Sequence, residues 1–191
     1  MNFRNYPIMS RLFNFFILVV LVLFISSCGE KSNKWEKYVS KDGGFSIYMP
    51  TPVKRSDKME VTAFGKQMTH FITWKPSSFA IAKFKLFQVS YTDCPARFSI
   101  DSLRRSAILD SSINLRKADF TELKDIEAYP IELNGYQGRC FIYQEINGNT
   151  IVIVKQCIVN NKRYDVTVVA KKDYPTNLEI SNFFNSFTVL K

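Results

Sequence analysis

The sequence has few of the residues on which common catalytic and metal sites depend. His70 is the only histidine among 191 residues, and none of the four cysteines has the Cys-x-x-Cys spacing of zinc and redox motifs. Gly-x-Ser-x-Gly and glycine-rich phosphate-binding patterns are also absent from the sequence. The sequence therefore supports neither an α/β-hydrolase nor a nucleotide enzyme, and we expect no metal and no cofactor.

The sequence also lacks an apolar run long enough to span a bilayer. The longest run, residues 12–25, is interrupted by Asn14 and is shorter than the roughly 20 residues that a transmembrane helix needs. Arg4 and Arg11 precede it, and two serines separate it from Cys28. A positive segment, a short apolar run and small residues, in this order, indicate a secretory signal.

Residues 25–29, Ile-Ser-Ser-Cys-Gly, resemble the lipobox of bacterial lipoproteins. The resemblance implies a signal peptide over residues 1–27 and a lipidated Cys28 that begins a polar tether over residues 28–34. Lipid on Cys28 would hold the protein at a membrane of the bacterial cell envelope. Gly29, in the place of an aspartate, is typical of lipoproteins that pass to the outer membrane.

The charge of the chain is positive but not concentrated. The formal net charge is +9, of which Arg4 and Arg11 supply two, so +7 remains from Cys28 onward. The basic residues are scattered singly or in pairs, whereas nucleic-acid binders tend to gather them on one surface. We therefore expect no nucleic-acid partner, and anionic lipid or an acidic protein is the partner that a basic surface would favour.

Most of the chain after the tether has the pattern of β-strands. β-branched and aromatic residues recur between turn-forming residues, and Asn147-Gly148-Asn149 is a strong hairpin signal. A change of apolar parity near Leu86 predicts a bulge. The expected strands cover residues 44–50, 61–64, 68–74, 79–91, 126–133, 139–146, 150–159 and 163–170.

Two segments have a helical pattern. One covers residues 100–111, with Asp101 as its expected cap. The other closes the chain, where Thr176 and Glu179 have capping-box spacing. Its apolar stripe is predicted to pack into the core and comprises Ile180, Phe183, Phe184 and Phe187.

These elements predict one domain over residues 35–191, of the α+β class, with an antiparallel β-sheet flanked by helices. The core and turn residues of this pattern are residues 42–47, Pro50, Pro52, Val89, Tyr91, Asp93, Pro95, Ile131, Leu133, Asn134, Gly135, Gly138, Arg139, Tyr164 and residues 184–187. Together they resemble the PsbP/Mog family of domains. The resemblance implies an α/β/α sandwich and a role in binding or assembling partners, with no active site shared across the family.

A loop between a long strand and a helix is the predicted binding site for a ligand or a partner. It contains Tyr91, Asp93 and Pro95, and such loops often carry binding residues. We therefore expect a non-enzymatic envelope lipoprotein that binds a protein or a small molecule. One alternative is a hydrolase or thiol enzyme that uses Cys94 and His70, and another is a structural lipoprotein that contacts anionic membrane through its basic surface.

Three cysteines remain if Cys28 carries lipid, so at most one disulfide can form within the chain. The hairpin signal at residues 147–149 leaves two registers open. A Gly148-Asn149 loop sets Cys140 opposite Cys157, whereas an Asn147-Gly148 loop offsets Cys157 by two residues on the same face. Only the first register permits the bridge. We predict a Cys140–Cys157 disulfide and a free Cys94, and the alternative is three reduced thiols that pack as small apolar groups.

Overall fold

The computed structural model describes residues 34–62, 65–77, 82–95, 106–110, 123–145, 148–173 and 177–190. Residues Lys34–Lys191 cluster as one compact unit. The signal, the lipobox and Cys28 lie outside the described residues, so their predicted roles stay predictions. Among the described residues, no helix is long and apolar enough to span a membrane.

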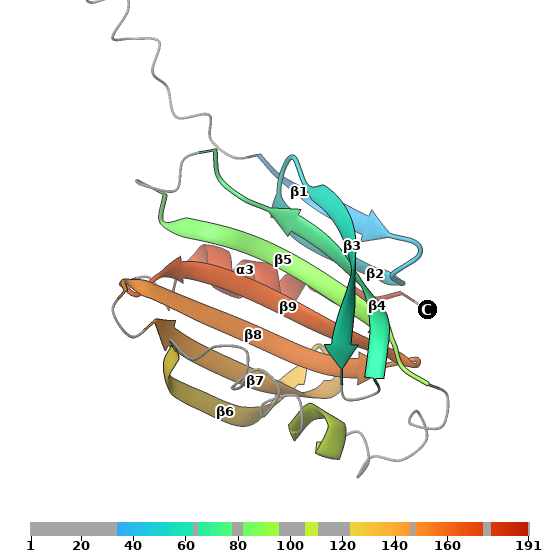
Figure 1. The fold of residues 1–191 in the computed structure, drawn as a ribbon. Coiled ribbons are helices and arrows are strands. Elements are labelled where there is room, and N and C mark those ends of the chain that lie inside the picture. Colours follow the sequence, from blue (N-terminus) through green and yellow to red (C-terminus); the bar gives the residue numbers. More distant parts are fainter. Residues whose placement is uncertain are drawn as a thin grey trace, which may run out of the picture. The chain divides into compact units, whose positions relative to one another are not determined.

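Seven antiparallel strands form the larger of two sheets (Figure 1). Four of them, β6 to β9, follow one another as a meander, and β3 and β6 are the two edge strands. β-branched and aromatic residues dominate these segments, as expected for strands that bury at least one face. In spatial order the strands are β3 (Lys54–Thr62), β4 (Gly65–Trp74), β5 (Phe84–Asp93), β9 (Lys162–Lys171), β8 (Thr150–Val159), β7 (Tyr136–Glu145) and β6 (Leu123–Leu133).

A smaller sheet and one helix cover one face of the larger sheet. The smaller sheet has the order β1 (Trp35–Ser40), β2 (Phe45–Pro50) and β10 (Thr188–Val189). The helix α3 (Leu178–Ser186) lies behind β5 and β9 in Figure 1. The Phe183 ring of α3 is 4.9 Å from the Phe87 ring of β5, which places the helix directly on the sheet.

The main hydrophobic core lies between the two sheets and α3. Alternate residues of β9, from Tyr164 to Ala170, point into it and are almost fully buried. Phe183 and Phe187 are 0% exposed, which confirms the predicted apolar stripe as core. Burying a phenylalanine side chain stabilises the fold by about 1.5–3 kcal/mol, so these rings hold the end of the chain against the sheet.

Several predictions of local structure are confirmed. The β5–β9 register shifts between Phe84 and Leu86, where the change of apolar parity had indicated a bulge. The closing helix is present, but its N-cap is Asn177, whose side chain accepts a hydrogen bond of 2.7 Å from the backbone N–H of Glu179. The predicted cap, Thr176, lies outside the described residues.

The predicted α+β fold class, an antiparallel sheet flanked by helices as in an α/β/α sandwich, is wrong. The structure is mostly β, with two sheets, and only residues 106–110 and α3 are helical among the described residues. The sequence pattern did not predict β1, β10 and the first seven residues of β3, because these segments are short or strongly charged. The expected helix over residues 100–111 lies outside the described residues except for the turn at 106–110.

Candidate functional site

A row of side chains crosses the larger sheet near one end of its strands. The register places Asp57 of β3 opposite His70 of β4, His70 opposite Tyr91 of β5, and Tyr91 opposite Tyr164 of β9. Residues that pair directly across antiparallel strands point to the same face of the sheet. The four side chains therefore share the face that the smaller sheet covers.

His70 connects the charged and aromatic members of this row. Its Nδ1 lies 2.8 Å from Oδ1 of Asp57, and its ring stacks on Tyr91 with centroids 4.7 Å apart. The His70 side chain is 31% exposed and that of Asp57 is 61% exposed, so the pair remains in contact with solvent. Asp57 and Tyr91 therefore fix the orientation of a partly exposed imidazole at the edge of the depression described below.

The turn between β1 and β2 forms a second wall. Ser40 Oγ accepts a 3.0 Å hydrogen bond from the Gly43 N–H and is also hydrogen-bonded to the Tyr91 side chain. Gly44 has φ of +67°, a left-handed conformation that favours glycine. The Tyr164 hydroxyl donates to the Gly43 carbonyl at 2.7 Å. These contacts fix the turn, and with it Asp42, beside Tyr91.

Tyr91 lies among three carboxylates. Burial raises the pKa of its hydroxyl, and the negative charges of Asp42, Asp57 and Asp93 raise it further, against the lowering effect of the hydrogen bond with Ser40. The phenol therefore stays protonated at neutral pH and can donate a hydrogen bond.

Lys162 supplies positive charge to the same place. Its Nζ lies 2.5 Å from Oδ1 of Asp93 and 5.4 Å from the centroid of the Tyr91 ring. The lysine side chain is 25% exposed, whereas that of Asp93 is 72% exposed. The ion pair thus leaves the carboxylate of Asp93 largely open to solvent at the rim.

These residues surround an open depression of about 440 Å³, which we call the Tyr91 pocket. Its volume is within the range of small-ligand sites. Arg55 lies over the Tyr38 ring at 5.4 Å, and the Tyr38 hydroxyl is buried without a hydrogen-bond partner among the described residues. Around Tyr91 and Tyr38, the ionisable side chains that line the pocket are Asp42, Arg55, Asp57, His70, Asp93 and Lys162.

The structure brings together two of the three residues of the predicted binding loop. Tyr91 and Asp93 line the Tyr91 pocket, whereas Pro95 does not. Both residues point to the pocket because they are two apart on β5 and therefore share a face.

Cys94 and His70, the pair proposed for a hydrolase or thiol enzyme, are not brought together. Cys94 packs with Ile108 and Ile158 in a separate apolar cluster. Burial raises the pKa of the Cys94 thiol to about 11, which disfavours the thiolate that a nucleophilic cysteine needs. The contacts of His70 are to Asp57 and Tyr91.

The β7–β8 hairpin adopts the register of the Asn147-Gly148 loop. Cys140 pairs with Lys155, and Cys157 pairs with Gly138, so the two cysteines are offset by two residues on one face. Both are buried free thiols in the structure. The predicted Cys140–Cys157 bridge belonged to the other register and is not formed here.

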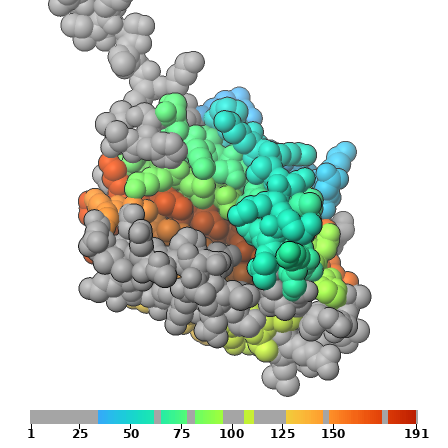
Figure 2. All heavy atoms as spheres, in the orientation of Figure 1, coloured from blue at the N-terminus to red at the C-terminus, as the bar shows by residue number. Residues whose placement is uncertain are grey.

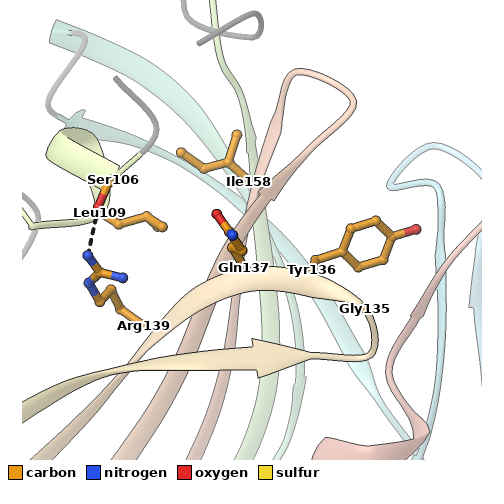
Figure 3. Close-up of a pocket in the computed structure, with 7 residues that line it drawn as sticks. All are labelled: Ser106, Leu109, Gly135, Tyr136, Gln137, Arg139 and Ile158. Carbon is orange, nitrogen blue, oxygen red and sulfur yellow. Dashed lines mark hydrogen bonds between the residues drawn. The ribbon is translucent and has the colours of Figure 1, made fainter. Parts of the chain in front are cut away.

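A second depression, of about 310 Å³, lies between residues 106–110 and the β6–β7 turn (Figure 3). Arg139 extends toward the helical turn, where it donates to Ser106 Oγ at 2.7 Å and to Asp110 Oδ1 at 2.8 Å. Tyr136 extends away from that contact in Figure 3. Because the guanidinium is engaged by residues of the same chain, Arg139 holds the helical turn to β7.

The sequence did not indicate Asp42, Arg55, Asp57 and Lys162 as residues of the site, and it indicated His70 only in the alternative pair with Cys94. The signal that could have found Asp57 is the β3–β4 hairpin, whose register places it opposite His70. Asp42 and Lys162 reach the pocket through contacts between distant segments, which no local pattern encodes. Among the described residues, no three His, Cys, Asp or Glu side chains group as metal ligands.

Among known proteins, the likeness that was found is to a solved structure and concerns the fold. No protein-family model matches the sequence, and no curated protein matches it either. The solution structure of cyanobacterial PsbP (CyanoP) from Synechocystis sp. PCC 6803 is similar, with a TM-score of 0.56 and 11% sequence identity. The match covers 85% of this chain and 97% of that chain. The chain has a PsbP-like fold.

Proposed function

We propose that this protein is a lipid-anchored envelope protein whose PsbP-like domain binds a protein or small-molecule partner at the Tyr91 pocket without performing chemistry on it. The observation that carries the proposal is the convergence of Tyr91 and Asp93 with His70 and Lys162 in one open depression. Charged groups of both signs can recognise a polar partner, while the strands fix the position of each side chain.

Photocrosslinking in cells tests binding at the pocket. A photoreactive phenylalanine analogue replaces Asp42, an exposed residue of the pocket, and the matched control replaces Lys37, an exposed residue of β1 that does not line it. We expect a crosslinked product from position 42, with a mass different from that of two copies of this chain, and none from position 37. Equal products from both positions, or no product from position 42, would contradict the proposal.

Lipid labelling tests the anchor separately. An alkyne-bearing fatty acid should label the wild-type chain in cells, and Cys28→Ser should abolish the label because the acceptor sulfur is lost. Cys94→Ser is the matched control and should leave the label unchanged. Labelling that persists in Cys28→Ser would remove the anchor from the proposal without affecting the pocket.

A further inference from the structure

The outer edge of β3 has no neighbouring strand in the larger sheet among the described residues. β3 pairs with β4 through nine consecutive residue pairs without a register shift, and its described backbone hydrogen bonds run to β4 alone. The opposite edge strand, β6, contains Pro130 and an irregularity between Lys124 and Glu127. Proline and bulges protect an edge from further pairing, and β3 has neither. Its charged side chains oppose pairing in every register except one that sets opposite charges across from each other.

Large apolar side chains are exposed on the same hairpin. Met59 is 56% exposed, Val61 is 70% exposed, and Met68, which pairs with Met59 across the hairpin, is 44% exposed. β5 begins to pair with β4 only at Thr69, so this end of the hairpin extends past its neighbour. In Figure 2 the atoms of the hairpin lie at the surface, with no other coloured element over them. An exposed, regular edge with apolar side chains is available for pairing with another chain.

We propose that β3 pairs edge to edge with β3 of a second copy of this chain, antiparallel and centred on Met59. A two-fold axis perpendicular to the joined sheet passes through one residue position, which faces the same residue of the second copy. All other residues pair symmetrically about that central residue, and paired side chains lie on the same face of the sheet. Centring on Asp57, Lys58 or Glu60 would place two identical charges directly opposite each other. Centring on Met59 places no like charges opposite each other.

The charges of β3 are self-complementary in this register. Lys58 lies opposite Glu60 of the second copy, and Glu60 lies opposite Lys58 of the second copy, which gives two symmetric ion pairs. Within one chain, Lys58 Nζ already lies 3.7 Å from Oε1 of Glu60, so both side chains are on the same face. Opposite charges directly across antiparallel strands stabilise the pairing, whereas like charges oppose it.

The apolar side chains are also self-complementary. Met59 meets Met59 of the second copy, and Met68 lies beside each of them, so four methionines form a continuous row across the joined sheet. Methionine is flexible and packs well in such a row. The same register sets Val61 of the second copy opposite Asp57, at the rim of the Tyr91 pocket. Pairing would therefore cover the exposed apolar groups and extend one wall of the pocket.

Disulfide trapping of the full chain in cells tests the register. Met59→Cys would place the two introduced cysteines directly opposite each other, with Cα atoms about 4.5–5.5 Å apart, which a disulfide tolerates. Val61→Cys is the matched control, because the two residues 61 would be about 14 Å apart along the strands. We expect an oxidant to give a dimer band on a non-reducing gel for Met59→Cys, at least about tenfold stronger than for Val61→Cys. The chain without an introduced cysteine shows the background from its native thiols.

Charge reversal then tests the ion pairs in the Met59→Cys background. Lys58→Glu alone and Glu60→Lys alone should each weaken the dimer band, because each places like charges opposite each other. The double variant Lys58→Glu/Glu60→Lys should restore the band, and co-expression of the two single variants should give the mixed dimer. Absence of the Met59→Cys band, equal trapping of Val61→Cys, or no effect of charge reversal would overturn the proposal. None of these outcomes depends on whether the Tyr91 pocket binds a partner.

Discussion

The Tyr164 hydroxyl is a sensitive test of how the β1–β2 turn is held beside the pocket. In Tyr164→Phe the ring keeps its contacts with Phe45 and Phe187, whose centroids lie 6.0 and 5.4 Å away, so packing is conserved. What is lost is the 2.7 Å hydrogen bond to the Gly43 carbonyl, which is then buried without this donor. A lost buried hydrogen bond that leaves its acceptor unsatisfied costs about 1–3 kcal/mol. We expect the free energy of unfolding to fall by about 1.5 kcal/mol.

Urea denaturation monitored by circular dichroism measures this change. With an m-value of about 2 kcal/mol per molar urea, the transition midpoint should fall by about 0.7 M at an unchanged slope. Tyr48→Phe is the matched control, because Tyr48 is 45% exposed and its substitution should change the stability by less than about 0.5 kcal/mol. A midpoint for Tyr164→Phe that matches the control would refute the role assigned to this hydrogen bond.

Three further predictions follow from buried groups. Burial raises the pKa of the Cys94 thiol from 9.0 to about 11, so native protein at pH 8 should alkylate at Cys94 about 100-fold more slowly than denatured protein. Mass spectrometry of timed samples measures the two rates. Equal rates would mean that the thiol is not buried. Burial likewise raises the pKa of Cys157 from 9.0 to about 12, so the stability that its neutral thiol contributes is complete below pH 9 and is lost as the pH rises toward 12. Urea midpoints between pH 8 and 11 should fall less steeply in Cys157→Ala, and parallel curves would contradict the assignment. Gly43→Ala would place a Cβ 2.6 Å from the Phe45 ring, so the free energy of unfolding should fall by about 1–3 kcal/mol. Thermal unfolding measures this change. An unchanged melting temperature would show that the turn can shift at little cost.

Local patterns predicted the elements whose apolar residues alternate or recur with one clear period. The meander from β6 to β9 follows from such runs, and the closing helix follows from the spacing of Ile180, Phe183 and Phe184. Strand β3 was largely missed because its sequence, Lys-Arg-Ser-Asp-Lys-Met-Glu-Val-Thr, is that of a charged edge strand that buries little. The fold class was wrong for a related reason, since β1 and β10 are defined by pairing with β2 rather than by their own composition.

The candidate site was predictable only in part. Tyr91 and Asp93 could be found because they close a long strand, where binding residues often lie. The partners that give them a chemical environment come from β3, β4, β9 and the β1–β2 turn. Their convergence depends on register and on the order of strands in the sheet, and a local pattern does not determine either. The two possible registers of the β7–β8 hairpin show the same limit, because a shift of two residues preserves every face.

We propose that a partner in the cell envelope binds this protein at the Tyr91 pocket. The most direct measurement is the yield of the product crosslinked from position 42 in cells, compared between the parent chain and the same chain carrying Lys162→Glu. Lys162 lines the pocket beside Asp93, and it is not one of the residues of the hydrophobic core. Its replacement by glutamate therefore reverses one charge of the pocket and leaves the side chains of the core unchanged. We predict that the product falls at least about tenfold with Lys162→Glu, which corresponds to about 1.4 kcal/mol, and is unchanged with Lys37→Glu. An undiminished product with Lys162→Glu would show that the partner binds elsewhere and would contradict binding at the Tyr91 pocket.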